Sequence, residues 1–245
     1  MAGASALCCL PGHSATDASY ARSNLENLVH PLLKILAALI PILLLGTPAP
    51  ARAAAPTKAQ SPAGAPAPAS VRRAVFAGGC FWCVEAAYEG TPGVVDVVSG
   101  YAGGSLANPS YERVSAGGTG HFEVVQVTYD PARIDYARLL DIYWRNVDPF
   151  DAGGQFCDRG ESYRAAIFVD GAAERQLAET SKASLARRFG KPIATRVIDA
   201  APFYAAEDYH QDYHVRNPLR YKYYSTSCGR AARLESIWGK AEKLR

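Results

Sequence analysis

The sequence lacks a large excess of charge of either sign. Its 245 residues contain 26 Lys and Arg against 23 Asp and Glu, which gives a formal net charge of +3. Proteins that bind nucleic acid depend on a strongly basic surface, so this balance gives no indication of such a partner. The length suffices for one sizeable domain with a hydrophobic core of its own.

The sequence also lacks an apolar run that could cross a bilayer near its N-terminus. The run Ile35–Gly46 follows Lys34 and has the length of a signal-peptide core, well short of the ~20 residues of a membrane-spanning helix. Ala51-Arg52-Ala53 then offers the small-x-small pattern of a signal peptidase site. Pro41 argues against the alternative of a buried globular helix. Residues 1–53 are therefore predicted to be a cleaved signal sequence for export to a bacterial periplasm.

Two further features concern this N-terminal region. Residues 1–28 are unusually long and polar for the start of a signal sequence, which suggests that translation begins at Val29. No cysteine follows the apolar run at the cleavage region, so a lipid anchor is not expected. Residues 54–70 are rich in Ala and Pro without apolar periodicity and are predicted to be a flexible linker. Residues 71–245 remain as the predicted folded domain.

Apolar patterning in this domain alternates between strand and helix periods. Strands are predicted at residues 73–77, 94–101, 122–129, 163–169 and 194–198, and helices at 80–88, 136–146 and 171–189. The pattern predicts a single α+β domain in which helices pack on a mixed sheet. After Pro202 the periodicity is weak, and this part is expected to be long irregular coil that wraps back over the sheet.

The segment Gly-Gly-Cys-Phe-Trp-Cys-Val-Glu, residues 78–85, is the most informative in the chain. A cysteine that follows two glycines at the end of an apolar strand lies at the start of a helix. There the free N–H groups and the helix dipole lower the pKa of a thiol. Cys80 is therefore predicted to be a nucleophile, with Phe81 and Trp82 as apolar walls for a small apolar substrate.

Glu123 is the candidate for a general acid, a group that donates a proton during the reaction. On the predicted strand 122–129, alternation places Glu123 on the same face as Val125 and Val127. A carboxyl group on an apolar face should have a raised pKa and hold a proton near neutrality. The alternative is a carboxylate at the end of a strand that reaches solvent.

Four blocks, in this order, resemble the peptide methionine sulfoxide reductase A family. They are the segment at 78–85, GTGHFEVVQVTYDP at 118–131, GGQFCDRGESYRAAIF at 153–168 and AEDYHQDY at 206–213. The resemblance covers roughly residues 72–240. It implies a two-layer ferredoxin-like fold and the repair of oxidative damage. The implied substrates are methionine S-sulfoxide in oxidised proteins or peptides and free methionine sulfoxide.

The resemblance also implies roles for individual residues. Cys80 would attack the sulfoxide sulfur, Glu123 would protonate the departing oxygen, and a sulfenic acid would remain on Cys80. The hydroxyl groups of Tyr111 and Tyr163 would hydrogen-bond the sulfoxide oxygen. Asp158 would position polar groups or water beside them. The two aromatic residues that follow Cys80 would hold the methyl group.

A second thiol would then condense with the sulfenic acid to form a disulfide, which an external thioredoxin-like dithiol reduces. Cys228, in the segment Ser-Thr-Ser-Cys-Gly-Arg, matches the family's C-terminal resolving cysteine and is favoured. Cys83, where many members have Gly, forms a Cys-x-x-Cys with Cys80 and remains the alternative. Cys157 has no assigned role. No bound cofactor is implied, and the protein is expected to be a monomer.

Two other functions compete with this prediction. Cys-x-x-Cys is also typical of a periplasmic thiol–disulfide oxidoreductase, but here two bulky aromatic residues separate the cysteines and no later proline precedes a strand. A zinc module built on the cysteines would lack a second close pair. His210 and His214 have the i,i+4 spacing of a zinc-binding helix, but residue 211 is Gln where that motif has Glu. No metal is therefore expected.

Overall fold

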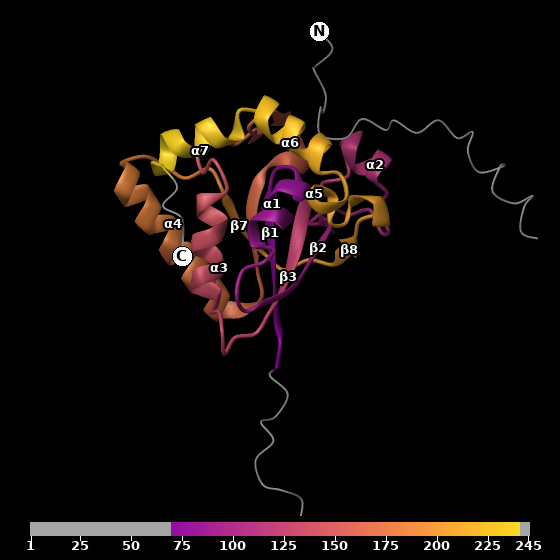
Figure 1. Ribbon diagram of the computed structural model, residues 1–245. Coiled ribbons are helices and arrows are strands. Elements are labelled where there is room, and N and C mark those ends of the chain that lie inside the picture. The colour runs from indigo at the N-terminus through magenta and orange to yellow at the C-terminus, as the bar shows by residue number, and fades with distance from the viewer. Residues whose placement is uncertain (1–69, 241–245) are drawn as a thin grey trace, which may run out of the picture. The chain divides into compact units, whose positions relative to one another are not determined.

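A six-stranded sheet organises the computed structural model, which describes residues 70–240 (Figure 1). The strands lie in the order β7-β6-β1-β3-β2-β8. They are β1 (Arg72–Gly78), β2 (Val94–Ala102), β3 (Phe122–Tyr129), β6 (Ala165–Val169), β7 (Arg196–Asp199) and β8 (Phe203–Ala205). The predicted signal sequence at 1–53 and the linker up to residue 69 lie outside the described residues.

The four inner strands have the topology of a ferredoxin-like fold. In the order β6-β1-β3-β2, they are the fourth, first, third and second of this set along the chain, and each neighbouring pair is antiparallel. β7 joins β6 in parallel, which makes the sheet mixed. The prediction of an α+β domain with a ferredoxin-like mixed sheet is therefore confirmed.

The main core lies between one face of this sheet and three helices. Phe76 on β1 is fully buried, and its ring centroid lies 5.3 Å from that of Tyr88 and 5.4 Å from that of Tyr143. The next residue, Ala77, belongs to a smaller cluster with Phe122 on the opposite face, as strand alternation requires. The helices are α1 (Phe81–Tyr88), α3 (Tyr136–Arg145) and α4 (Gly171–Phe189). Figure 1 shows α1 in front of β1 and β3.

Short elements connect these parts. A helical turn, α2 (Tyr111–Ser115), precedes β3, and a small hairpin pairs β4 (Gly154–Gln155) with β5 (Asp158–Arg159). The predicted strand 163–169 begins later than expected, because Glu161–Tyr163 form the 3-10 turn η1 before β6. Within the part of the chain that the structure describes, no helix combines the length and apolarity needed to span a membrane.

The segment after Pro202 is largely helical, so the prediction of irregular coil there was wrong. It contains η2 (Asp208–His210), α5 (Tyr213–Arg216), α6 (Pro218–Ser227) and α7 (Arg230–Trp238). Among the residues of α6 only Tyr224 is buried, and α7 buries only its two end residues. Apolar residues on each helix nevertheless pack against the core at helical spacing, namely Tyr221, Tyr224 and Cys228 along α6 and its C-cap, and Leu234, Ile237 and Trp238 on α7. The prediction overlooked these narrow stripes. The local signals were present, since Pro218 opens α6 and Gly229, with φ +66°, separates it from α7.

Candidate active site

A tight glycine turn places Cys80 at the start of α1. β1 ends at Gly78, Gly79 has φ +85°, and Cys80 is the N-cap of the helix. The carbonyl group of Cys80 accepts a hydrogen bond from the Cys83 N–H at 3.1 Å. The Cys80 residue is only 1% exposed. The sequence placed this cysteine where a strand gives way to a helix, and the structure has it there.

Gly79→Ala is expected to destabilise the protein and to misplace Cys80. A Cβ atom at this position would lie 2.5 Å from the Cβ atom of Gln155. Gln155 cannot easily move, because its side chain bonds the backbone N–H and carbonyl of Asp148 at 2.8 and 2.9 Å. We expect a loss of about 2–4 kcal/mol in the free energy of unfolding, measured by chemical denaturation.

Gly90→Ala is the matched control for this substitution. Gly90 also has a positive φ, +72°, but a Cβ atom there would meet nothing within 4 Å. Gly90→Ala should lower the free energy of unfolding by only about 1 kcal/mol, the cost of placing an alanine at a positive φ. Equal losses in the two variants would contradict the close approach at Gly79.

Glu123 is buried beside Cys80 with its carboxyl group held by the backbone. It is 1% exposed, and its Oε2 accepts a hydrogen bond from the Phe81 N–H at 3.0 Å. Burial raises the pKa of Glu123 to about 8, although the Phe81 N–H opposes this shift. A hydrogen bond with Tyr163 also lowers this pKa, while the charge of Asp158 raises it. The carboxyl group is therefore largely protonated at neutral pH, and it is not a carboxylate that reaches solvent.

Cys83 lies next to Cys80 and shares a hydrogen bond with it. That bond lowers the pKa of Cys83 to about 7, against the effect of burial. The positive charge of Arg230 and a hydrogen bond from Tyr221 also lower the pKa of Cys83. Cys83 is therefore partly ionised at neutral pH. A thiolate is thus available in the first turn of α1, next to Cys80.

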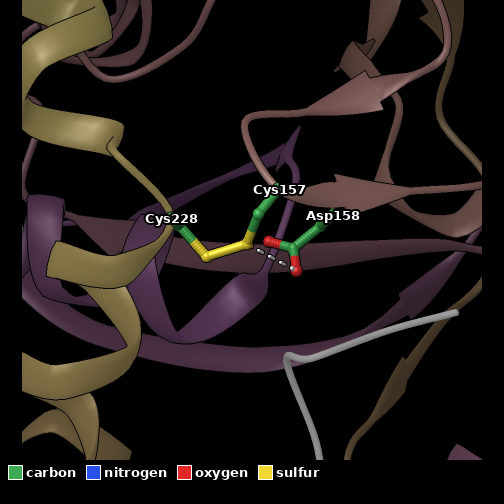
Figure 2. A group of neighbouring side chains, drawn as sticks. All are labelled: Cys157, Asp158 and Cys228. Atoms are coloured by element: carbon green, nitrogen blue, oxygen red, sulfur yellow. Dashed lines mark hydrogen bonds between the residues drawn. A yellow bond between two sulfur atoms is a disulfide. The ribbon is translucent and has the colours of Figure 1, made fainter. Parts of the chain in front are cut away.

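Cys228 is bonded to Cys157, the cysteine to which the sequence gave no role. Figure 2 shows this disulfide, whose Cα atoms lie 4.9 Å apart, beside Asp158. The Cys157 sulfur lies 3.7 Å from Asp158 Oδ1. This is a contact, because a disulfide sulfur carries no hydrogen. Asp158 is 1% exposed and accepts a hydrogen bond from the Tyr224 hydroxyl. Asp158 thus lies beside the disulfide and close enough to raise the pKa values of Glu123 and Cys83 by its charge.

An aromatic wall lines the site on the side of α5. The ring of Trp82 stacks on that of Tyr213 with centroids 3.6 Å apart, and its Nε1–H donates to His210 Nδ1 at 3.2 Å. The ring of His210 lies 4.9 Å from that of Phe81 and 4.8 Å from that of Tyr111. Burial lowers the pKa of His210 to about 4. The imidazole is therefore neutral at pH 7 and belongs to this wall.

Glu207 is a positioning residue that the sequence analysis did not single out. Its Oε1 accepts from the Tyr111 N–H at 2.9 Å, and its Oε2 accepts from the Tyr101 hydroxyl at 3.0 Å. The carboxylate thereby ties the start of α2 to β2 and to the segment before η2. Its only signal was its place in the block AEDYHQDY, directly before the aromatic residues of the wall.

The comparisons with known proteins agree with this geometry. Residues 72–242 match the family model described as peptide methionine sulfoxide reductase. The chain belongs to this family. It is 55% identical over 167 residues to peptide methionine sulfoxide reductase MsrA 2 of Caulobacter vibrioides, covering 68% of this chain and 85% of that protein. It is 51% identical to MsrA of Bacillus licheniformis, covering 68% and 93%.

Solved structures show the same relationship. Methionine sulfoxide reductase A of Corynebacterium diphtheriae superposes with a TM-score of 0.56 at 33% identity, covering 64% of this chain and 78% of that one. The reduced form of Mxr1 from Saccharomyces cerevisiae gives a TM-score of 0.58 at 35% identity, covering 62% and 89%. These structures support the α+β fold of the chain.

Family membership makes the chain a peptide-methionine (S)-S-oxide reductase, an oxidoreductase that repairs oxidised methionine. The family uses no prosthetic group, and an external thiol reductant is consistent with it. The Cys157–Cys228 pair, which lies at disulfide distance, fits a mechanism that uses thiols. The alternative of a general thiol–disulfide oxidoreductase is not favoured.

Proposed function

We propose that Cys80 attacks the sulfur of methionine S-sulfoxide while Glu123 gives its proton to the oxygen. The attack forms a bond between the two sulfur atoms, and the protonated oxygen then moves from the substrate sulfur to the Cys80 sulfur. As the S–O bond of the substrate and the new S–S bond break, methionine leaves and Cys80 is left as a sulfenic acid. The observation that carries this proposal is the position of Glu123, a neutral buried acid bonded to the N–H of the residue after Cys80. The test is stoichiometric reduction of the S epimer by reduced protein without added reductant.

We further propose that the aromatic residues and the remaining polar groups hold the substrate. Phe81 and Trp82 would enclose the methyl group, a role that their burial in the aromatic wall supports. Tyr111 and Tyr163 would donate their hydroxyl groups to the sulfoxide oxygen. Asp158 would position these groups through its network with Tyr224. A dry, apolar site favours attack by a soft nucleophile at sulfur.

Cys83 is the resolving thiol that the geometry supports best. It is hydrogen-bonded to Cys80, whereas Cys228, which the sequence favoured, is engaged with Cys157. Condensation of the Cys80 sulfenic acid with the Cys83 thiol forms a Cys80–Cys83 disulfide and releases water. A reduced Cys157–Cys228 pair could then take over this disulfide by two exchange steps. These exchange steps end with the Cys157–Cys228 disulfide that the structure contains, and both of these cysteines are partly exposed.

The variant Cys83→Ser tests whether Cys83 or Cys228 reacts first with the sulfenic acid on Cys80. After one turnover, we expect the Cys80 sulfenic acid to persist in Cys83→Ser and to be trapped by dimedone. Cys228→Ser should still form a Cys80–Cys83 disulfide, identified by peptide mapping. A persistent sulfenic acid in Cys228→Ser and a normal disulfide in Cys83→Ser would reverse the assignment.

We propose a thioredoxin-like dithiol as the external reductant and a periplasmic location for the enzyme. The reductant follows from the chemistry, since a protein disulfide is returned to thiols by exchange with a dithiol. The location rests on the signal-like features of residues 1–53. Mass spectrometry of the N-terminus from a bacterial periplasmic fraction tests it. A mature N-terminus after Ala53 is expected, and retention of the full chain in the cytosol would contradict export.

A further inference from the structure

Glu85 carries a buried carboxyl group that the proposed chemistry does not use. It lies on α1, is 0% exposed, and neither of its carboxylate oxygens has a hydrogen-bond partner. The Ser99 side chain and the backbone of Asp212 lie near enough to influence it, but neither forms a hydrogen bond of normal geometry with it. Buried polar groups are almost always satisfied, so an unpartnered carboxyl group points to a missing ligand such as an ion.

Two other side chains with metal-binding atoms surround this group. Glu89 follows Glu85 by four residues and so lies on the same side of α1, and His214 belongs to α5. Glu89 Oε2 and His214 Nε2 are 3.0 Å apart, and His214 Nδ1 is buried without a partner. One ligand atom from each of the three residues lies within 4.8 Å of the others. Three protein ligands therefore converge from two helices.

We propose that Glu85, Glu89 and His214 form a binding site for a divalent cation of the zinc class. Carboxylate oxygen and imidazole nitrogen bind Zn²⁺ at about 2.0–2.2 Å, and small side-chain rotations would bring the three ligand atoms to that distance. Calcium and magnesium prefer oxygen ligands alone, so the imidazole favours the zinc class. A bound cation would favour the ionised form of the buried Glu85. Glu89 and His214, whose side chains are 25% and 21% exposed, leave a route from solvent.

The sequence concealed this site because His214 does not act with His210. The two histidines are four residues apart but belong to different elements, η2 and α5. His210 accepts from Trp82 in the aromatic wall, whereas His214 faces Glu89. The helical His pair that a zinc-binding motif requires therefore does not form. The ligands are supplied instead by contact between α1 and α5.

A cation here would fasten α5 to α1. The neighbour of His214 in the chain, Tyr213, stacks on Trp82 in the aromatic wall. The cation would therefore raise thermal stability and hold that wall in place. This inference does not depend on which residues carry out the reduction, because none of the three ligands is assigned to the chemistry.

Zinc binding to the full chain tests the proposal once the thiols are removed as competitors. The background protein carries Cys80→Ser and Cys83→Ser, keeps the Cys157–Cys228 disulfide, and has Cys8 and Cys9 blocked with N-ethylmaleimide. We expect calorimetry to give one Zn²⁺ per chain at this site, with a rise in Tm. Co²⁺ should give a visible spectrum without a sulfur-to-metal charge-transfer band.

Ligand variants in the same background decide the outcome. His214→Leu and Glu89→Gln should each weaken Zn²⁺ binding at least about tenfold, whereas Glu235→Gln, on the exposed side of α7, should not. Unchanged affinity in the folded Glu89→Gln and His214→Leu variants would overturn the proposal. So would the absence of binding and of any Tm shift in the folded background protein. If His214→Leu fails to fold, the partly exposed Glu89 still provides the test.

Discussion

Cys80→Ser should abolish methionine sulfoxide reduction, with a fall in kcat/KM of about 10⁴-fold or more. The serine hydroxyl is a poor nucleophile toward sulfur and cannot accept the oxygen as a sulfenic acid. In a covalent mechanism, removal of the nucleophile removes its whole contribution to the rate, and such substitutions give the largest losses of activity. The measurement is reduction of a peptide containing methionine S-sulfoxide with a dithiol reductant.

Cys157→Ser is the matched control for this loss. It also removes one cysteine near the site, but Cys157 forms the disulfide with Cys228 beside Asp158 and is not assigned to the first chemical step. It should retain a normal first turnover and lose only recycling. If Cys80→Ser kept its first turnover while Cys157→Ser lost it, the nucleophile would be misassigned.

Glu123→Gln should lower kcat/KM by about 10²–10⁴-fold, the usual contribution of a general acid. Glutamine keeps the size of the side chain but has no proton to give to the oxygen. In the unmodified enzyme, activity should fall as pH rises through about 8, because burial raises the pKa of Glu123 to about 8 and the acid is then lost. The residual activity of Glu123→Gln should lack this fall. A pH profile unchanged by the substitution would contradict the role.

The same pKa shift predicts a gain of stability in Glu123→Gln at alkaline pH. Between the ordinary carboxyl pKa of 4.5 and about 8, the folded protein keeps a proton on Glu123 that the unfolded chain releases. The contribution of Glu123 to the free energy of unfolding therefore falls as pH rises through this range. Glutamine removes that penalty, so the variant should be more stable than the unmodified protein at pH 9.

Glu174→Gln is the control for the loss of activity in Glu123→Gln. Burial also raises the pKa of Glu174, but this residue lies on α4, away from Cys80. It should leave activity unchanged.

Local pattern was enough to predict the groups proposed for the first chemical step. Alternation along β3 placed Glu123 on the face of Val125 and Val127, and both valines lie in the main core. The two glycines after an apolar run predicted the turn from strand to helix before Cys80, and Gly79 has a positive φ at this turn. These inferences needed only the period of a strand and the geometry of a helix start.

Contacts between distant segments could not be predicted in this way. Cys157 and Cys228 are 71 residues apart, and the bond between them depends on how α6 ends beside the β4–β5 hairpin. Glu207 and Tyr101 likewise meet only because β8 pairs with β2 and brings the following residues to that edge. Single-sequence periodicity carries no information about such pairings. The helices α6 and α7 were missed for another reason, because only a narrow apolar stripe on each packs against the core, as Leu234, Ile237 and Trp238 do on α7.

Single-turnover reduction of the separate S and R epimers, followed by peptide mapping, tests the central claim most directly. Fully reduced protein is mixed with a slight excess of each methionine sulfoxide peptide in the absence of external reductant. The account predicts stoichiometric loss of the S epimer alone, with the oxygen trapped on Cys80 when Cys83→Ser blocks resolution. Loss of neither epimer from folded, reduced protein, or oxidation that maps to another cysteine first, would contradict it.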